Sequence, residues 1–335
     1  MIKSGVNRPT AATGLSEGSK ASAPRPFSRG ALVVLLGLAC VLLIAWAHSP
    51  RRSPLNPDDL ILEPAALLPA GADGEVSGMV PSLRHPHIYW TVGDSGNAAS
   101  IYPVRLQPGL PSKAELPSNA NAATQLPPAP GISVTNAANR DWEDITRDAQ
   151  GHLIIADLGN NSNARKDLCL YFVDEPDLNA PQTAAARKLV LEYPDQTDFP
   201  SPRDHFNFDA EAVFTIGDAI YVLTKHRSDT FTSMYKVTDP ASDQASSLEY
   251  VDRFDVKGQV TGATASDDGL KLAVLTYNRI WLFARQSTLT PFFAAKVSSR
   301  TYRYAHGASV SESICFEDSN TLLITDEVRA SVARV

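Results

Sequence analysis

The sequence is poor in sulfur, with three cysteines and three methionines among 335 residues. Cys40 lies inside an apolar run, which leaves Cys169 and Cys315 for the rest of the chain. So few cysteines exclude a disulfide-rich scaffold and a zinc site built on four thiolates. The two remaining cysteines fall in the second and fifth of the repeats described below, which are not adjacent in a ring of five. We therefore expect buried free thiols rather than a disulfide.

Positive charge is also scarce outside the first 52 residues. That segment carries a net charge of +6, whereas the whole chain carries −7, so the remainder carries −13. Nucleic acid needs a basic face, and we predict no nucleic-acid partner for such an acidic domain. The chain contains no Walker loop, no dinucleotide-binding glycine fingerprint, no CxxC pair and no zinc-binding helix motif.

Long apolar runs are absent except for residues 31–47, which carry no charge. This length spans a bilayer as a helix, and the basic residues before it place the N-terminus inside. We predict a disordered cytoplasmic tail over 1–29, a transmembrane signal anchor over 30–48 and a proline-rich linker over 49–59. The alternative is a signal peptide cut after the A-x-A sequence at 45–47. Either reading exports the domain that follows.

A module of short strands recurs five times after the linker. Each copy has an apolar strand opened by an acidic or small polar residue, a turn, and a second apolar strand with a polar end. The openings are Glu75–Gly78, Asp141–Asp144, Asp209–Ala212, Val260–Ala263 and Glu312–Cys315. Repetition of strands at this period is typical of a β-propeller. We predict an all-β domain over 60–335 with five blades, or alternatively six, whose last blade is closed by the N-terminal strand Leu60–Leu68. A proline-dense excursion interrupts the first blade at 107–131.

The polar ends of these strands predict one functional face, because a propeller brings equivalent positions together around its axis. The expected ligand-binding residues are Glu75, Asp94, Asp144, Asp209, Lys225, Tyr277 and Asp326. The expected metal ligands, with calcium as the cation because it prefers oxygen donors, are Glu143, Asp157, Asn160, Glu211 and Glu312. The alternative is a structural network in which these carboxylates pair with Arg165, Lys225 and Arg279.

Several of these runs resemble a family of exported bacterial β-propeller proteins described as WD40-like or NHL-like. They are Asp141–Ile145, Asp157–Asn161, Asp209–Ala212, Leu223–Lys225 and Val260–Ala263. The resemblance covers about residues 75–335. It implies the propeller fold and an extracytoplasmic location. Together with the predicted anchor, we expect a single-pass protein of the bacterial cell membrane whose C-terminal domain is periplasmic or extracellular. It supplies no substrate.

Two functions follow from this reading. The first is a binding or scaffold module that uses the acidic face to recognise a small-molecule or protein ligand. The alternative is a calcium-dependent hydrolase acting on a phosphoester or a lactone. The carboxylates beside Asn160 and Asn161 favour the second, and the lack of a convincing nucleophile triad favours the first.

Overall fold

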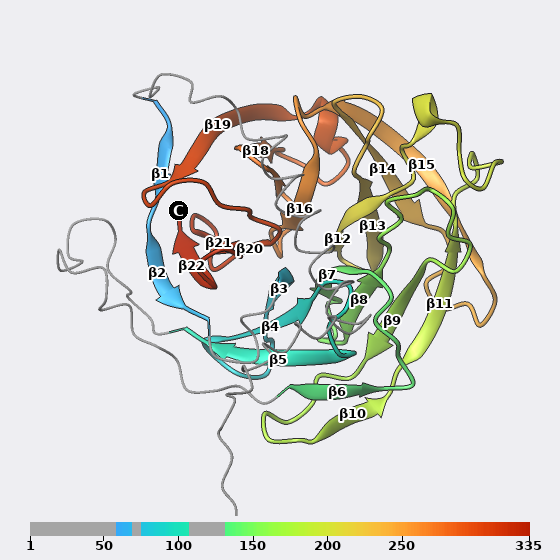
Figure 1. Ribbon diagram of the computed structural model, residues 1–335, viewed down its shortest axis with the longest axis horizontal. Helices are drawn as coiled ribbons and strands as arrows, with labels where there is room; N and C mark the ends of the chain where they lie inside the picture. The colour runs from blue at the N-terminus through green and yellow to red at the C-terminus, as the bar shows by residue number, and fades with distance from the viewer. Residues whose placement is uncertain (1–57, 69–74, 107–130) are drawn as a thin grey trace, which may run out of the picture. The chain divides into compact units, whose positions relative to one another are not determined.

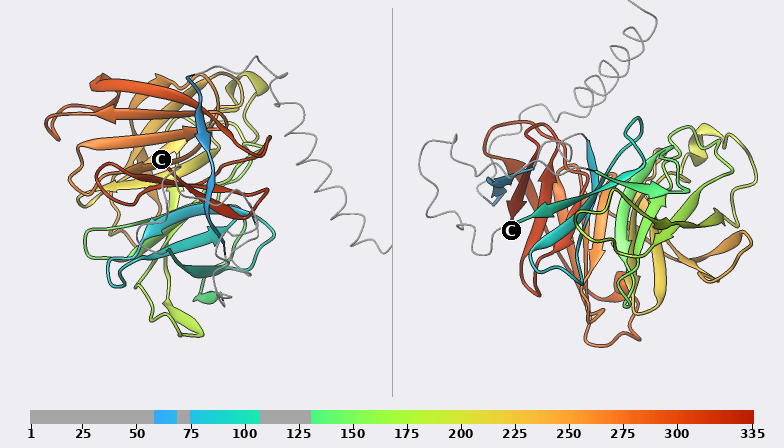
Figure 2. Two further views of the ribbon diagram at one scale, coloured as in Figure 1. Left: turned by 90° about the vertical axis from the view of Figure 1, so that its left-hand side faces the viewer. Right: turned by 90° about the horizontal axis from the view of Figure 1, so that it is seen from below.

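The computed structural model describes residues 58–68, 75–106 and 131–335 (Figures 1 and 2). The chain divides into two units, Met1–Arg51 and Arg52–Val335, and all described residues belong to the second. Their regular secondary structure is almost entirely strand, with two 3-10 helices, η1 (Arg203–His205) and η2 (Phe292–Ala294). No helix of this described part has the length and apolar character needed to cross a membrane. The predicted anchor at 30–48 lies outside the described residues, as does most of the excursion at 107–131.

The strands form four sheets. The first runs in the order β10 (Gln182–Ala185), β6 (Ile132–Thr135), β5 (Ser100–Arg105), β4 (Ile88–Gly93), β3 (Val76–Pro81). The last runs in the order β2 (Pro64–Leu67), β22 (Ser331–Arg334), β21 (Leu322–Asp326), β20 (Ile314–Phe316). The sheet before it runs in the order β1 (Leu60–Leu62), β19 (Lys296–Tyr304), β18 (Arg279–Ala284), β17 (Lys271–Thr276), β16 (Val260–Ala265).

The remaining sheet has eight strands and is two antiparallel halves joined at their outer edges. One half is β7 (Trp142–Arg147), β8 (Leu153–Asp157), β9 (Cys169–Val173) and β11 (Arg187–Glu192). The other half is β15 (Ser246–Asp255), β14 (Phe231–Val237), β13 (Ala219–Thr224) and β12 (Ala210–Ile216). The halves meet through a short parallel pairing of β11 with β15. Both outer edges are therefore partly covered, which limits edge-to-edge pairing with other chains.

The first strands of the repeats lie nearest the centre of a ring (Figure 1). β3 contacts β7, β7 contacts β12, β12 contacts β16, β16 contacts β20, and β20 contacts β3 again. The contacts between the inner strands thus form a closed ring, and the arrangement is propeller-like. The turns between first and second strands follow the sequence signals: Gly217 and Gly269 adopt positive φ angles of 58° and 66°, which glycine tolerates best.

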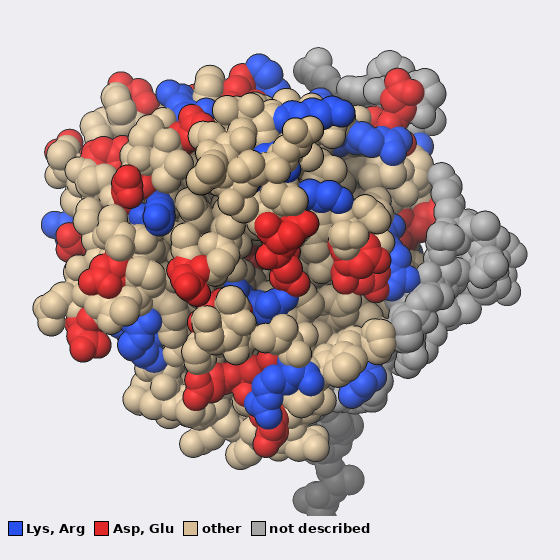
Figure 3. Space-filling view, turned by 180° about the vertical axis from the view of Figure 1, so that it is seen from behind, with Lys and Arg blue, Asp and Glu red and all other residues tan. Residues whose placement is uncertain are grey.

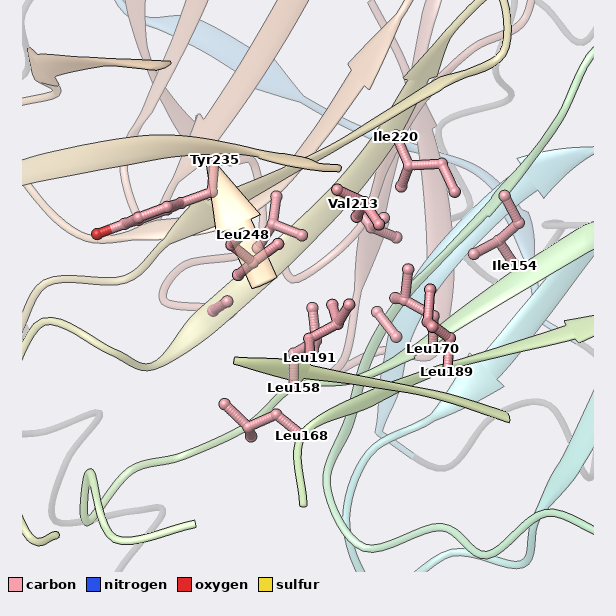
Figure 4. Close-up of a cluster of buried hydrophobic side chains, with 14 of the residues drawn as sticks. Ile154, Leu158, Leu168, Leu170, Leu189, Leu191, Val213, Ile220, Tyr235 and Leu248 are labelled. Carbon is pink, nitrogen blue, oxygen red and sulfur yellow. The ribbon is translucent and has the colours of Figure 1, made fainter. Parts of the chain in front are cut away.

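Apolar side chains fill the spaces between neighbouring sheets all the way around. Figure 4 shows one such cluster, in which Ile154 and Leu170 from β8 and β9 lie with Val213 and Ile220 from β12 and β13. All four are almost completely buried. Each buried aliphatic side chain stabilises the fold by about 1.5–3 kcal/mol. A further cluster joins the last sheet to the first, since Ala66 and Leu323 pack with Met79.

The predicted closure by segment Leu60–Leu68 is confirmed for its second part. β2 pairs with β22 and completes the last sheet. The first part goes elsewhere: β1 pairs in parallel with β19 of the preceding sheet. The segment is thus shared between two outer edges. Cys169 and Cys315 are free and buried, as predicted.

Candidate functional site

Four of the inner strands carry a β-bulge near their start. The pairing register skips one residue in each case, namely Ser77, Glu143, Glu211 and Thr261. All four residues are buried. A bulge redirects the side chain of the extra residue and ends regular pairing. In two of the repeats that residue is a glutamate, and these two glutamates form the centre of the candidate site.

Glu143 belongs to two groups of three carboxylates. In the first triad, Asp94, Asp141 and Glu143 each offer an oxygen within 4.8 Å of the others; in the second triad, the same holds for Glu143, Asp209 and Glu211. Asp94 directly follows β4, and Asp141 and Asp209 directly precede β7 and β12. The site is therefore assembled where inner strands begin and the neighbouring strand of the first sheet ends.

Two of the three acids of the second triad, Glu211 and Asp209, are paired with basic side chains. Lys225 Nζ lies 2.8 Å from Glu211 Oε1, and Arg227 Nη2 lies 2.6 Å from Asp209 Oδ2. The backbone N–H of Asn160 donates to Asp209 Oδ1 at 2.6 Å. Because Lys225 and Glu211 are both almost fully buried, each compensates a charge that burial would otherwise disfavour.

The first triad has no direct ion pair among the described residues, although the more distant Arg165 partly offsets the rise that burial causes in the pKa of Asp141. Among the described residues, no ion pair joins Asp94, Asp141 or Glu143 to a basic side chain. Burial raises the pKa of Asp94 to about 8, and repulsion by Glu312 and Asp141 adds to the shift. Burial followed by repulsion from Glu211 and Asp94 raises the pKa of Glu143 well above its ordinary value. Three carboxyl groups in this position need protons or a bound cation.

Gly159 allows the loop after β8 to approach these carboxyl groups. A Cβ at this position would lie 2.2 Å from Glu143 Oε1 and 2.3 Å from Asp141 Oδ2. The Gly159 N–H donates to the Asp141 carbonyl at 3.1 Å and fixes the loop against the start of β7. In the run Asp157–Asn161, Gly159 is thus the residue that lets the loop pass close to the carboxyl groups. The sequence analysis did not assign this role.

One predicted metal ligand, Asp157, lies outside both triads because the strand register differs from the sequence alignment. Asp157 pairs with Trp142, so it corresponds to Gly93 and not to Asp94 in the first repeat. A shift of one residue turns a strand side chain to the other face. Asp157 instead binds Arg165, with Arg165 Nη2 2.8 Å from its Oδ1.

Glu312 lies outside both triads but close enough to interact electrostatically with Asp94, Glu211 and Lys225. Ile314 pairs with Ile324 as Ala212 pairs with Leu223, and no bulge is recorded in the β20–β21 pairing. Its side chain hydrogen-bonds Glu327, and burial together with Glu312 raises the pKa of Glu327 to about 11. Of the five predicted metal ligands, only Glu143 and Glu211 enter a triad.

Asn160 is a predicted ligand whose side chain is fully engaged in holding its own loop. Its Oδ1 accepts the Arg165 N–H at 2.9 Å, and its Nδ2 donates to the Phe208 carbonyl at 3.0 Å. The amide that was expected to face a metal therefore fixes the loop that carries Gly159.

The predicted ligand-binding residues divide into two sets. Asp94 and Asp209 enter the triads, and Lys225 lies beside Tyr277, with Nζ 5.1 Å from the ring centre. Glu75 is exposed and its carbonyl accepts the Asp94 N–H at 3.0 Å.

Asp144 and Asp326 serve other purposes. Asp144 accepts hydrogen bonds from the Ile145 N–H at 2.8 Å and the Val213 N–H at 2.9 Å, which ties β7 to β12. Asp326 lies 2.9 Å from His306 Nε2. Both carboxylates are buried beside these partners.

The sequence reading missed three residues of the site. Asp141 opens the second repeat and could have been found from its alignment with Asp209. Arg227 follows Lys225 by two residues, and Glu327 follows Asp326, but no repeat signal marks either. Arg279, which was expected in the ionic network, instead donates to Ser299 Oγ at 2.9 Å.

Charges elsewhere are mixed. On the face drawn in Figure 3, acidic and basic side chains are interspersed rather than gathered into areas of one sign. The buried triads thus differ from the surface in concentrating charge of one sign.

No protein-family model matches the chain, and no curated protein matches it in sequence. Solved structures similar to it include hydrazine synthase of Kuenenia stuttgartiensis, at 8% identity, 78% of this chain, 83% of that chain and a TM-score of 0.41. A proposed gluconolactonase matches at 12% identity, 77% of this chain, 73% of that chain and a TM-score of 0.41. A mitotic checkpoint complex matches at 12% identity, 93% of this chain, 68% of that chain and a TM-score of 0.34. Similarity at this level assigns no activity, so the propeller-like fold rests on the strand pairing and the site on its own geometry.

Proposed function

We propose that the protein is an exported binding module, a five-bladed β-propeller that holds a divalent cation in the first triad and recognises its ligand there. Each inner strand would begin one blade, and the segment 30–48 would anchor the domain outside a bacterial membrane. The observation that carries the proposal is the difference in ion pairing between the two triads that share Glu143. The second triad has Lys225 and Arg227, whereas no ion pair neutralises the first among the described residues.

Calcium is the cation that this chemistry favours. The three groups of the first triad supply only carboxylate oxygens, which are hard donors, and calcium accepts six to eight such ligands at about 2.3–2.6 Å. Three carboxylates leave part of that coordination shell for water or for oxygen atoms of a ligand. A ligand with carboxylate or hydroxyl oxygens is therefore the class we expect the module to bind.

A calcium-dependent hydrolase of phosphoesters or lactones is the second candidate. The observation in its favour is that burial raises the pKa of Glu211 to about 7 and of Asp94 to about 8. Carboxyl groups that titrate near neutrality can transfer protons beside a metal. His226 does not add a base, because its ring nitrogens lie 2.7 Å from Asp229 Oδ1 and 3.2 Å from Ser233 Oγ.

Calcium titration of the chelator-treated full chain tests the proposal. We expect heat of binding in calorimetry and a higher melting temperature, since a ligand at a hundredfold excess over its Kd stabilises by about 2.7 kcal/mol. Asp94→Asn and Asp141→Asn should remove the response. Asp198→Asn, a change at an exposed residue, is the matched control.

Two results would decide against the proposal. Wild-type protein that neither binds calcium nor gains stability from it has no such site, and an unchanged response in Asp141→Asn places the ion elsewhere. Assays with a phosphodiester and an aliphatic lactone separate the two functions. Calcium-dependent turnover that Glu211→Gln abolishes supports the hydrolase, and calcium binding without turnover supports the binding module.

A further inference from the structure

Two loops meet beside the triads. The first loop, residues 158–168, joins β8 to β9 and carries Gly159, which passes close to the first triad. The second loop, residues 193–209, joins β11 to β12 and ends at Asp209 of the second triad. The Asn160 N–H of the first loop donates to Asp209 Oδ1 at 2.6 Å. The contacts that hold the two loops together therefore bear on the geometry of both triads.

Asn163 lies at the junction of the two loops and is completely buried. Its Oδ1 accepts the Phe208 N–H at 2.9 Å, and its Nδ2 donates to the Asn160 carbonyl at 2.9 Å. Its own carbonyl accepts the Ser201 N–H at 3.2 Å and a hydrogen bond from Gln196 Nε2 at 2.9 Å. This one residue thus bonds the second loop at three places and its own loop at one.

The backbone at Asn163 also restricts which residue can make these bonds. Its φ is positive, at 51°. Among residues with a side chain, asparagine and aspartate adopt this left-handed conformation most readily. Aspartate would lack the Nδ2 donor, and glycine would lack both side-chain bonds. Asparagine is therefore the residue type that suits both the backbone and the hydrogen-bond partners at this position.

We propose that Asn163 is a positioning residue of the cation site, which fixes the first loop to the second and so holds Gly159 against the first triad. Gly159 permits the close approach to Glu143 and Asp141, and the bonds of Asn163 maintain it. Arg165 Nη1 also donates to the Gly159 carbonyl, at 2.7 Å, but this bond lies within the first loop. The inference rests on the proposed function, because it gives Asn163 a part in holding the cation there.

Calcium affinity of the full chain is the first test. Asn163→Gly keeps the left-handed backbone and loses both side-chain bonds. We expect its calcium affinity, measured by calorimetry, to fall about tenfold, because each lost hydrogen bond weakens the hold on the loop a few-fold. Asn136→Gly is the matched control, since Asn136 also has a positive φ, of 63°, but is exposed and lies outside both loops. An affinity of Asn163→Gly equal to that of the control overturns the proposal.

A double-variant cycle separates positioning from a general loss of stability. If Asn163 acts through Gly159, then Gly159→Ala and Asn163→Gly together should lower calcium affinity about tenfold, as much as either alone. The reason is that the loop, once displaced by one substitution, has little left to lose from the other. Independent effects multiply instead, to about a hundredfold. A hundredfold loss in the double variant contradicts the proposal.

Amide hydrogen exchange, followed by NMR in chelator, tests the positioning without calcium. In Asn163→Gly the N–H groups of Gly159 and Asn160 should exchange about tenfold faster, whereas Ile155 in β8 should keep its rate. Unchanged exchange at both amides overturns the proposal. Wild-type protein that binds no calcium refutes the proposed function instead, and the exchange rates then still decide whether Asn163 holds the loop.

Gln196→Ala is the milder variant, to be used if Asn163→Gly does not fold. Gln196 Nε2 donates to the Asn163 carbonyl at 2.9 Å and to Ser201 Oγ at 3.3 Å. The variant loses both bonds and keeps the Asn163 side chain, so we expect about a threefold loss of calcium affinity and a similar rise in exchange at Asn160. Thr197→Ala at the exposed neighbour is its control. No change in either quantity counts against the proposal as decisively as in Asn163→Gly.

Discussion

The two triads that share Glu143 are built from neighbouring copies of the same module. They differ in whether a lysine lies beside their carboxylates. Asp94 follows β4 and Lys225 follows β13, and each donates its N–H to the residue before the partner inner strand. The two residues therefore occupy equivalent positions. Where the position holds lysine, the adjoining Glu211 is paired at 2.8 Å. Where it holds aspartate, a third acid joins Asp141 and Glu143. The fold thus places equivalent positions around the ring, and the residue type at this strand end, which is acidic beside the first triad and basic beside the second, decides which triad is left for a cation.

Removing the lysine should have the largest effect on this contrast. Lys225→Met leaves the buried Glu211 without its closest cation, and breaking a buried pair in this way costs about 3–5 kcal/mol. The measurement is urea unfolding at pH 8. At pH 6 the cost should be smaller, because Glu211 then takes up a proton. Lys296→Met on exposed β19 is the control, and a loss no greater than in that control would contradict the assigned role of the pair.

A methyl group at Gly159 should disturb the first triad selectively. In Gly159→Ala the new Cβ meets the carboxyl groups of Glu143 and Asp141, so both must move. We expect calcium affinity to fall about tenfold, or about 1.4 kcal/mol, while Lys225 and Glu211 keep their pairing. Gly258→Ala is matched, because a Cβ there would lie 3.6 Å from its nearest neighbour. Equal calcium affinity in the two variants would show that the loop does not shape the site.

The pH dependence of stability should give an effect about as small as that of Gly159→Ala. Asp94 has a folded pKa of about 8 against an ordinary value of 3.8. Between these values the folded state keeps a proton that the unfolded state has released, so stability falls as pH rises from about 4 to 8. In chelator we expect a loss of about 1–2 kcal/mol between pH 5.5 and 8.5, after screening by solvent.

Two further measurements test whether Asp94 causes this pH dependence: one in saturating calcium and one on a variant. Saturating calcium favours the ionised carboxylates, so it should flatten or reverse the slope. Asp94→Asn removes the titrating group and should also make the slope in chelator shallower. A wild-type slope that rises with pH in chelator would show that these carboxyl groups are ionised without a cation.

Much of the architecture could be read from the chain because short-range patterns carry it. Alternating apolar strands, turns at Gly217 and Gly269, and the truncated last repeat predict the strand order and the closing role of β2. The bulges could not be read in this way. They insert one residue into each of four strands, and in two of them that residue is Glu143 or Glu211. The register also pairs Asp157 with Trp142, so Asp157 does not occupy the strand position of Asp94 to which it had been aligned.

The sequence by itself determined the repeat, the acidic character of its strand ends and the free state of the two buried cysteines. These features depend only on residue type and spacing, which can be read from the sequence. Only the tertiary structure decided which carboxylates meet and which are neutralised. That outcome depends on contacts between residues far apart in the chain, such as Asn160 with Asp209 and Asp94 with Glu143, and on the bulged register that brings them within a few ångströms.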